Sequence, residues 1–274
     1  MILDKIVEQR KIQLEQEKSR LAPEIIKALA FSMKDTPADF YKALKKETLS
    51  VIAEVKKASP SKKVICEEFH PVEIATQYEK AGADAVSCLT EEFYFQGSRE
   101  YLNAITRNIQ IPVLKKDFII DEYQIYDARI TGASAVLLIS AVLDTETMKK
   151  FYDIAKSLGL ECLFEAHNEQ ELESIMKCDA RIIGVNNRNL KTFEVSLDNS
   201  ANLMKLIPGC CVKISESGIA TNEDMKKVRS AGADAVLIGE TLVKSNDIKG
   251  AMKTLRAGVR SLTSAGSAGH RIYS

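Results

Sequence analysis

A nine-residue pattern recurs three times along the chain and limits its fold more than any other feature. AGADAVSCL begins at Ala81, TGASAVLLI at Thr131 and AGADAVLIG at Ala231. The glycines of the three copies lie 50 and then 100 residues apart, both multiples of about 25, which is near the length of one strand–helix unit. In each copy we expect a helix to end at the glycine, which accepts a positive φ, and a buried strand to follow.

Short apolar runs with the same rhythm predict eight strands. They cover 51–55, 85–89, 112–116, 135–139, 161–166, 182–186, 211–216 and 235–239. Amphipathic stretches such as 71–81, 145–158 and 222–231 lie between them and predict helices. Strict alternation of strand and helix favours parallel strands with right-handed crossovers. Eight such units favour a closed α/β structure, a (β/α)8 TIM barrel, over an open doubly wound sheet, and no GxGxxG follows the first strand.

The length suits one barrel with an addition at its N-terminus. The chain has 274 residues, and a barrel of this kind typically needs about 250. We assign residues 48–262 to the barrel as the catalytic domain. Residues 1–47 predict an N-terminal helical extension that covers one barrel end, where its helices either plug the barrel or roof an active site. Residues 263–274 are rich in small residues and predict a flexible tail.

Five of the predicted strands end in polar residues on the face that should point into the barrel. Residues two apart share a face of a strand, and each of these sets begins apolar or small. The sets are Ile52, Glu54 and Lys56; Leu114 and Lys116; Leu163 and Glu165; Gly184, Asn186 and Arg188; and Ile214 and Glu216. In a barrel they form a polar mouth at the carboxyl ends of the strands, where active sites lie. An ion-pair network could explain any one charge, but six charges together favour general acid–base chemistry.

Small residues after the last two predicted strands indicate a phosphate site. Ser217 and Gly218 follow the seventh strand, and Gly239 closes the eighth. Barrels often bind phosphate between these two loops, through backbone N–H groups and a helix N-terminus. Glu240 comes next, so we expect its backbone N–H to serve while its carboxylate points away. The SPS segment at 59–61 is a second candidate phosphate or lid element.

Charge and cysteine usage limit the partners. Lys and Arg number 38, and Asp and Glu also number 38, so the formal net charge is zero. A nucleic-acid groove or an anionic membrane favours a basic excess, so neither partner is expected. Six cysteines without a CxxC pair predict reduced thiols in a cytoplasmic protein, and no cluster has metal-ligand spacing. His167 is interpreted as a loop or helix-start residue near the mouth.

Seven segments resemble the indole-3-glycerol phosphate synthase family of tryptophan biosynthesis. They are AEVKKASPS at 53–61, LTEEFYFQGS at 89–98, VLKKDFIID at 113–121, ECLFEAHNEQE at 161–171, IGVNNRNL at 183–190, ISESGI at 214–219 and LIGETL at 237–242. They occur in family order, and the similarity runs over roughly residues 1–260. One departure is Lys63, because the family usually has glycine there. If that position needs a positive φ, the first loop of this chain must move differently from the loop of family members that have glycine there.

The resemblance implies a carboxy-lyase that acts on 1-(2-carboxyphenylamino)-1-deoxyribulose 5-phosphate. The products are indole-3-glycerol phosphate, carbon dioxide and water, and no cofactor is needed. Lys116 is implied as the general acid of ring closure and Glu165 as the general base of dehydration. Lys56 is implied to hold the substrate carboxylate and to donate a proton during dehydration. Asn186 is implied to position the substrate and the glutamate, and Arg188 to bind the substrate anion.

The resemblance also implies supporting roles for further residues. Glu54 and Glu216 orient the lysines and the sugar hydroxyls. The phosphate is held by Ser217, Gly218, Gly239 and the backbone of Glu240, with Ser59 and Ser61 on the mobile first loop. The apolar wall around the anthranilate ring is formed by Phe93, Phe95, Leu137 and Leu190.

Two other classes of function stay open at this point. Another phosphosugar enzyme on the same barrel is one, such as phosphoribosylanthranilate isomerase or a Schiff-base aldolase. An isomerase needs a Cys/Asp pair where this chain has Glu54, Lys56 and Asn186, and an aldolase uses a lysine as a covalent nucleophile. A non-catalytic barrel that binds a phosphorylated ligand or a partner is the other. For the leading hypothesis the expected partner is a small phosphosugar substrate, and the expected state is a monomer or a weak homodimer.

Overall fold

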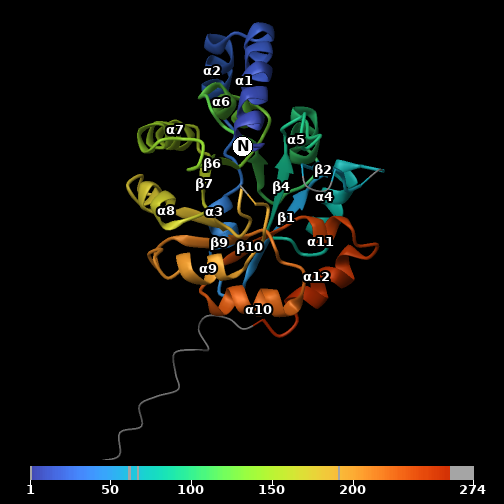
Figure 1. Cartoon of the computed structure of the whole chain (residues 1–274). Helices are drawn as coiled ribbons and strands as arrows, with labels where there is room; N and C mark the ends of the chain where they lie inside the picture. Colours follow the sequence, from blue (N-terminus) through green and yellow to red (C-terminus); the bar gives the residue numbers. More distant parts are fainter. Residues whose placement is uncertain (1, 61–62, 67, 191, 260–274) are drawn as a thin grey trace, which may run out of the picture.

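Eight parallel strands close into a barrel in this computed structural model, which describes residues 2–60, 63–66, 68–190 and 192–259. The strands are β1 (Ser50–Val55), β4 (Ala85–Leu89), β5 (Val113–Lys116), β6 (Ala135–Ile139), β7 (Glu161–Ala166), β8 (Ile182–Asn186), β9 (Val212–Glu216) and β10 (Ala235–Ile238). They follow one another in the order β1-β10-β9-β8-β7-β6-β5-β4, and β4 pairs with β1 to close the ring (Figure 1). The predicted (β/α)8 fold is confirmed, each strand within one residue of its expected ends. The tail predicted at 263–274 lies outside the described residues.

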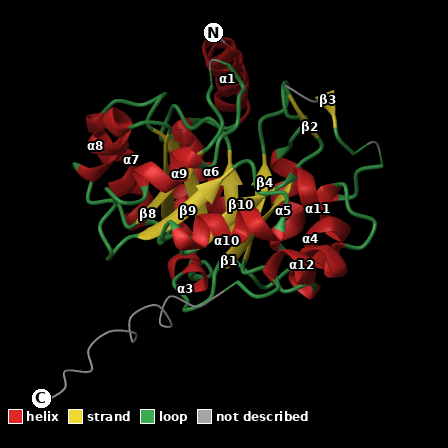
Figure 2. Ribbon diagram, turned by 60° about the horizontal axis from the view of Figure 1, so that its bottom comes forward, coloured by secondary structure: helices red, strands yellow, loops and turns green. Residues whose placement is uncertain are grey.

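Helices follow the strands and cover the outside of the barrel (Figure 2). They are α4 (Pro71–Lys80), α5 (Arg99–Thr106), α6 (Tyr123–Ile130), α7 (Thr145–Ser157), α8 (Glu169–Met176), α9 (Asp198–Leu203), α10 (Asn222–Ser230), α11 (Glu240–Val243) and α12 (Ile248–Arg256). Thr221 and Asp224 form a capping box at the start of α10. Gly82, Gly132 and Gly232 have φ angles of 86°, 85° and 102°, as the repeat predicted for residues between a helix and a strand. None of the described helices is long and apolar enough to cross a membrane.

Side chains alternate between the barrel interior and the layer beneath the helices. Ile52, Leu114, Leu163 and Ile214 are fully buried and belong to one cluster inside the barrel. Their neighbours along the strands, such as Val51, belong to a separate cluster that contacts the helices. The four interior residues are the apolar members of the sets that end in polar side chains. These strands therefore direct the expected apolar residues into the barrel.

The N-terminal helices occupy both ends of the barrel. They are α1 (Ile2–Arg20), α2 (Pro23–Ser32) and α3 (Phe40–Leu44). Phe40 and Leu44 are fully buried in the interior cluster with Ala85 and Ala235, the first residues of β4 and β10. Helix α3 therefore plugs the end at which the strands begin. Helix α1 lies at the opposite end (Figure 2).

A short hairpin follows β1 on the first loop. Its strands β2 (Ala58–Ser59) and β3 (Lys63–Val64) pair antiparallel. Lys63 has a φ of 54°, in the left-handed region that costs a residue with a side chain roughly 1–2 kcal/mol. The position at which the family usually has glycine thus keeps a positive φ when lysine occupies it.

Candidate active site

A cavity of about 820 Å³ opens where the barrel strands end. Most of the residues predicted for the site line this cavity. They are Glu54, Lys56, Ser59, Phe95, Lys116, Leu137, Glu165, Asn186, Arg188, Leu190, Glu216, Ser217, Gly218, Gly239 and Glu240. The barrel thus brings together residues from the carboxyl-terminal halves of its strands and from the loops that follow them. Two predicted residues are not among them: Phe93 lies outside the cavity and is 62% exposed, and Ser61 lies outside the described residues.

Glu54 and Lys56 form an ion pair at the end of β1. Lys56 Nζ donates to Glu54 Oε1 at 2.5 Å. Burial raises the pKa of Glu54, but Lys56 and Lys116 outweigh it and hold that pKa below its ordinary value. A Cβ at Gly239 would lie 2.5 Å from Glu54 Oε1 and 3.0 Å from Lys56 Nζ. A side chain at position 239 would therefore displace the ends of Glu54 and Lys56 from these positions.

Lys116 ends β5 and lies between two buried carboxyl groups. Its Nζ is 3.6 Å from Glu165 Oε2 and 3.7 Å from Glu216 Oε2. Burial lowers the pKa of Lys116, but Glu165, Glu216 and Glu54 outweigh it and raise that pKa above its ordinary value of 10.5. The amine is therefore charged at neutral pH and holds a proton that it can donate.

Glu165 and Glu216 have opposite protonation tendencies although both are buried. Burial raises the pKa of Glu165, but Lys116 and His167 outweigh it, so the pKa lies below its ordinary value. Burial and repulsion by Glu165 raise the pKa of Glu216 well above its ordinary value. The two shifts favour an ionised Glu165 and a protonated Glu216. Among the described residues, neither oxygen of Glu216 has a hydrogen-bond partner.

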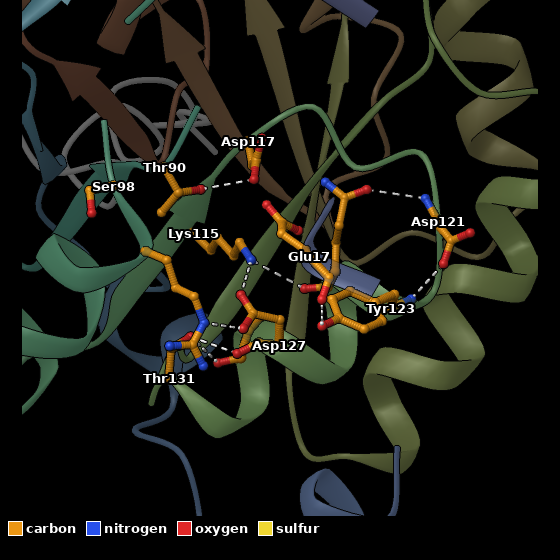
Figure 3. A network of polar contacts seen from close by, with 12 residues as sticks. Glu17, Thr90, Ser98, Lys115, Asp117, Asp121, Tyr123, Asp127 and Thr131 are labelled. Atoms are coloured by element: carbon orange, nitrogen blue, oxygen red, sulfur yellow. Dashed lines mark hydrogen bonds and ion pairs between the residues drawn. The ribbon is translucent and has the colours of Figure 1, made fainter. Parts of the chain in front are cut away.

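Lys115 precedes Lys116 and points out of the barrel into a buried ion network (Figure 3). It is 2% exposed. Its Nζ donates to Asp127 Oδ2 of α6 at 2.6 Å, and Asp127 Oδ1 accepts from Arg99 Nε of α5 at 2.5 Å. Burial raises the pKa of Asp127, but Lys115 and Arg99 outweigh it and lower that pKa. The network anchors β5 to the two helices behind it.

Asp117 follows Lys116 and connects β5 to the N-terminal extension; Figure 3 shows its contact with Thr90. Arg10 of α1 donates from Nε to Asp117 Oδ1 at 3.1 Å and from Nη2 to Oδ2 at 3.3 Å. Thr90 donates to the same carboxylate at 3.0 Å. Arg10 also pairs with Glu17 on its own helix at 2.9 Å. Lys116 thus lies between two residues that are each fixed by buried ion pairs.

The end of β8 is fixed by amide side chains. Asn186 Oδ1 accepts from the backbone N–H of Arg188 at 3.0 Å. Asn199 of α9 donates to the carbonyl of Asn186 at 2.8 Å. The guanidinium of Arg188 donates to the carbonyl of Phe193 at 3.4 Å, across the loop that follows the strand. These contacts hold Asn186 and Arg188 at the cavity wall.

The two loops predicted to hold phosphate border the same cavity. Ser217 and Gly218 have φ angles of 66° and 85°, so a serine adopts the left-handed region directly after β9. Asn187, which the sequence analysis did not single out, donates to the carbonyl of Ser217 at 3.0 Å. The carboxylate of Glu240 is engaged by Lys244 Nζ at 2.6 Å. Lys244 therefore offsets the negative charge next to this loop.

The loop after β4 turns Phe95 toward the cavity and Phe93 away from it. Its shape comes from Glu91, whose carboxylate accepts from the backbone N–H groups of Phe93, Tyr94 and Phe95 at 3.0, 2.8 and 2.9 Å. The rings of Phe95 and Phe118 lie 6.1 Å apart, and both residues line the cavity. Phe118 thus stands beside Phe95 in the apolar wall, whereas Phe93 does not reach it.

The sequence model of the indole-3-glycerol phosphate synthase family matches residues 3–255. The chain belongs to this family. The indole-3-glycerol phosphate synthase of Ruminiclostridium cellulolyticum is 49% identical over 257 residues, which cover 93% of this chain and 99% of the relative. That of Acetivibrio thermocellus is 48% identical over 259 residues, which cover 94% and 100%. The family predicted from the seven segments is confirmed.

Solved structures outside the indole-3-glycerol phosphate synthase family share the barrel fold. 3-Hexulose-6-phosphate synthase from Salmonella typhimurium superposes with a TM-score of 0.63 at 13% identity, covering 77% of this chain and 98% of that chain. Thiamine phosphate pyrophosphorylase from Pyrococcus furiosus gives a TM-score of 0.58 at 14% identity, covering 78% and 96%. At these identities the likeness shows the fold alone.

In this member of the synthase family, helix α1 also lines the cavity. Ile2, Leu3 and Ile6 border it from above the ends of the strands. Helix α3 thus fills the barrel end at which the strands begin, and α1 borders the cavity at the other end. The helical spacing of apolar residues predicted these helices, but not which barrel end each one covers. Among the described residues, no group of three or more His, Cys, Asp or Glu side chains is placed to hold a metal ion.

Proposed function

We propose that this chain is a cytoplasmic enzyme that converts 1-(2-carboxyphenylamino)-1-deoxyribulose 5-phosphate into indole-3-glycerol phosphate, carbon dioxide and water. One observation carries the proposal: Lys116 Nζ lies 3.6 Å from Glu165 and 3.7 Å from Glu216. A proton donor, a base and a neutral acid thus share one cavity with the two candidate phosphate loops. The reaction needs no cofactor, and we propose a monomer or a weak homodimer as the working state.

Lys116 supplies the proton of the first step. The aromatic carbon that carries the carboxylate attacks the ketone, and the ketone oxygen takes the proton of Lys116 as the new carbon–carbon bond forms. The bond to the carboxylate then breaks, carbon dioxide leaves and the aromatic ring is restored. The raised pKa of Lys116 keeps the amine charged until the alkoxide develops. A well-placed general acid typically contributes about 10²–10⁴-fold in rate.

Glu165 and Lys56 serve the dehydration. Lys56 protonates the hydroxyl group that leaves as water, and Glu165 takes the proton released as the five-membered ring becomes aromatic. Glu165 can then pass this proton to the neutral amine of Lys116, whose Nζ is 3.6 Å away, so that one transfer resets both groups. Lys56 regains its proton from solvent. The cycle thus consumes one proton, which is what the loss of a carboxylate as carbon dioxide requires.

The other residues bind and orient the substrate. Lys56 and Arg188 face its carboxylate, and Asn186 positions Glu165. Glu54 orients Lys56, and Glu216 lies where a neutral acid can hydrogen-bond a sugar hydroxyl. The phosphate is held by Ser217, Gly218, Gly239 and Glu240, with Ser59 and Ser61 on the first loop. The aromatic ring is placed against Phe95, Leu137 and Leu190; Phe93 is left out because it is exposed.

The test of this function follows indole fluorescence from the carboxyphenylamino substrate. The unaltered enzyme should form product, and Lys116→Ala should lower turnover at least about 10²-fold, because the ketone oxygen loses its proton donor. Calorimetry should still detect substrate binding to that variant. Lys150→Ala, which removes only the exposed ion pair with Glu122, is the matched control and should retain activity.

Two results would contradict the assignment. Near-normal turnover in Lys116→Ala would remove the lysine from its role as general acid. A mass increase after borohydride reduction with substrate present would reveal a Schiff base, the mark of an aldolase. Binding of substrate by the unaltered protein without any fluorescence would instead indicate a non-catalytic barrel.

A further inference from the structure

His167 lies behind the proposed general base. It comes directly after β7, and its Nε2 is 3.4 Å from Glu165 Oε1. The side chain is 9% exposed. Among the described residues, Nε2 has no hydrogen-bond partner that meets ordinary geometry. His167 is not among the residues that line the cavity. Any effect that it has on the reaction must therefore pass through a residue of the cavity wall, and Glu165 is the one that its ring approaches.

The other ring nitrogen of His167 is held by Glu171. Nδ1 lies 3.0 Å from Glu171 Oε2, and the same oxygen accepts from the backbone N–H of His167 at 2.8 Å. The second oxygen of Glu171 accepts from Asn168 Nδ2 at 2.7 Å. Asn168 is the N-cap of α8 and accepts in turn from the backbone N–H of Glu171 at 2.9 Å. The carboxylate is therefore anchored to the start of α8.

The backbone of His167 is tied to the strand next to β7. Asn199 of α9 donates from Nδ2 to the carbonyl of His167 at 3.1 Å and to the carbonyl of Asn186 at 2.8 Å. One amide thus links His167 to Asn186, a residue of the cavity wall. Together with the contacts of Glu171, this holds the ring in place, with Nε2 at 3.4 Å from Glu165 Oε1.

The charges around His167 favour its imidazolium form. Glu165 of β7 and Glu171 of α8 each present a carboxylate, Lys116 of β5 presents an ammonium group, and α9 presents the neutral amide of Asn199. Carboxylates only accept hydrogen bonds, so a donor at both ring nitrogens satisfies both partners. Burial lowers the pKa of His167, but Glu171 and Glu165 outweigh it and raise that pKa above its ordinary value of 6.5.

On the basis of the function proposed above, we propose that His167 is a positioning residue of the dehydration step. Its imidazolium donates from Nδ1 to Glu171 and from Nε2 to Glu165 Oε1. Because Oε1 is held in this way, Oε2 remains directed at Lys116 and at the substrate. The anchored pair of His167 and Glu171 thus sets the orientation of the base without touching the substrate.

This role has a consequence for the pH dependence of the second step. When His167 loses its Nε2 proton, a lone pair faces Glu165 Oε1 and the carboxylate is no longer held. The dehydration rate should therefore fall as the pH rises through the pKa of His167, above 6.5. We call this decline of the rate the alkaline limb of the pH–rate profile. Lys116 cannot produce it, because the pKa of Lys116 is raised from 10.5 and lies at far higher pH.

The experiment compares dehydration rates of the full-length protein across the neutral pH range in single-turnover quenched-flow measurements. His167→Gln keeps one neutral donor near Glu165 but cannot titrate. We expect dehydration to slow about tenfold at neutral pH, the value of one hydrogen bond to a charged group, and the alkaline limb to disappear. Substrate KM should stay unchanged. His70→Gln is the control, because the His70 side chain makes no cap hydrogen bond to α4.

A second variant keeps the proposal testable if His167→Gln fails to fold. Glu171→Gln removes the charge next to Nδ1, so the limb should move to lower pH. The ring proton of His167, one of three histidines in the chain, should titrate at lower pH by the same amount in NMR spectra. The proposal is overturned if His167→Gln keeps the wild-type limb, or if Glu171→Gln moves neither quantity. An unaltered enzyme without product formation would overturn the proposed function itself.

Discussion

Gly184 leaves the space that the carboxyl group of Glu216 occupies. It lies on β8 opposite Ile214 of β9, two residues before Glu216, and a Cβ built there would overlap Glu216 Oε1 and contact Leu163 Cδ1 at 3.1 Å. The carboxyl group is buried, and its pKa is raised well above the ordinary value, first by burial and then by repulsion from Glu165. The absence of a side chain at position 184 is therefore part of what places a neutral acid 3.7 Å from Lys116.

We predict that Gly184→Ala displaces Glu216 and lowers kcat/KM by about 10²-fold, the loss that a small misplacement of a catalytic group can cause. The overpacked interior should also cost roughly 1–3 kcal/mol of unfolding free energy. Gly209→Ala is the matched control, because a Cβ there meets nothing within 4 Å. Steady-state kinetics and urea unfolding of the two variants provide the measurement. Equal activity in both would show that Glu216 does not need its observed position.

At the scale of residues, a simple rule predicted the site well. Side chains alternate along a strand, so Lys116 and Glu165 could be assigned to the cavity from sequence spacing alone. The need for a glycine at position 184, next to the carboxyl group of Glu216, could not be predicted in this way. It depends on the pairing of β8 with β9, in which Asn186 lies beside Glu216, and on the rotamer of the glutamate. Neither can be read from a single strand.

At the scale of elements, one buried arginine connects the roof of the cavity to the strand that carries Lys116, the proposed general acid. Arg10 is 3% exposed on a helix whose first turns contribute Ile2, Leu3 and Ile6 to the cavity. Its guanidinium contacts Asp117, the residue after Lys116, through two nitrogens. The position of the roof and the position of β5 are therefore linked by one ion pair.

We predict that Arg10→Met raises the KM for substrate several-fold and lowers the unfolding free energy by about 3–5 kcal/mol, the usual cost of leaving a buried charge unpaired. Asp117 would keep Thr90 but lose its counter-charge. Lys11→Met removes only an exposed pair with Glu8 and should change neither quantity. Kinetics and thermal unfolding test this. If the variant is destabilised but its KM is unchanged, the position of α1 does not affect substrate binding.

The loops and terminal helices were less predictable than the strands. Phe93 and Phe95 lie in one segment and look equivalent in the sequence. They differ because Glu91 accepts three successive backbone N–H groups and thereby bends the loop. Likewise, helical spacing predicted α1 and α3 but could not show that they cover opposite ends of the barrel. The positions of this loop and of these helices depend on contacts between residues far apart in the chain, and such contacts leave no periodic pattern in the sequence.

At the scale of the whole molecule, the repeat of strand and helix was sufficient to predict the barrel. Buried strands of four to six residues followed by amphipathic helices have few ways to cover both faces of a parallel sheet, and eight units allow closure. The burial and the protonation of the charged groups at its mouth then depend on the entire fold. Their carboxyl groups are buried only when all the strands are in place, so their protonation is coupled to unfolding.

The shifted carboxyl groups predict how stability depends on pH. Burial raises the pKa of Glu54 and Asp127, but neighbouring cations outweigh it and lower both values below 4.5 and 3.8. Their contribution to the unfolding free energy is present when the pH is above those ordinary pKa values. It is lost as the pH falls through the pKa values of the folded state. Glu216 behaves oppositely, because its folded-state pKa is raised. Its contribution is complete below 4.5 and is lost as the pH rises through the folded-state value.

We therefore predict that the unfolding free energy is highest at mildly acidic pH and declines toward both sides. Glu216→Gln should keep the acid decline but lose most of the alkaline one, because glutamine stays neutral like the protonated acid that it replaces. A smaller alkaline loss should remain from His167, whose pKa is also raised. Urea midpoints measured from acid to alkaline pH provide the test, with the exposed Glu223→Gln as control. If Glu216→Gln and wild type decline equally at alkaline pH, Glu216 is ionised in the native enzyme, and its assignment as the neutral acid beside Lys116 is wrong.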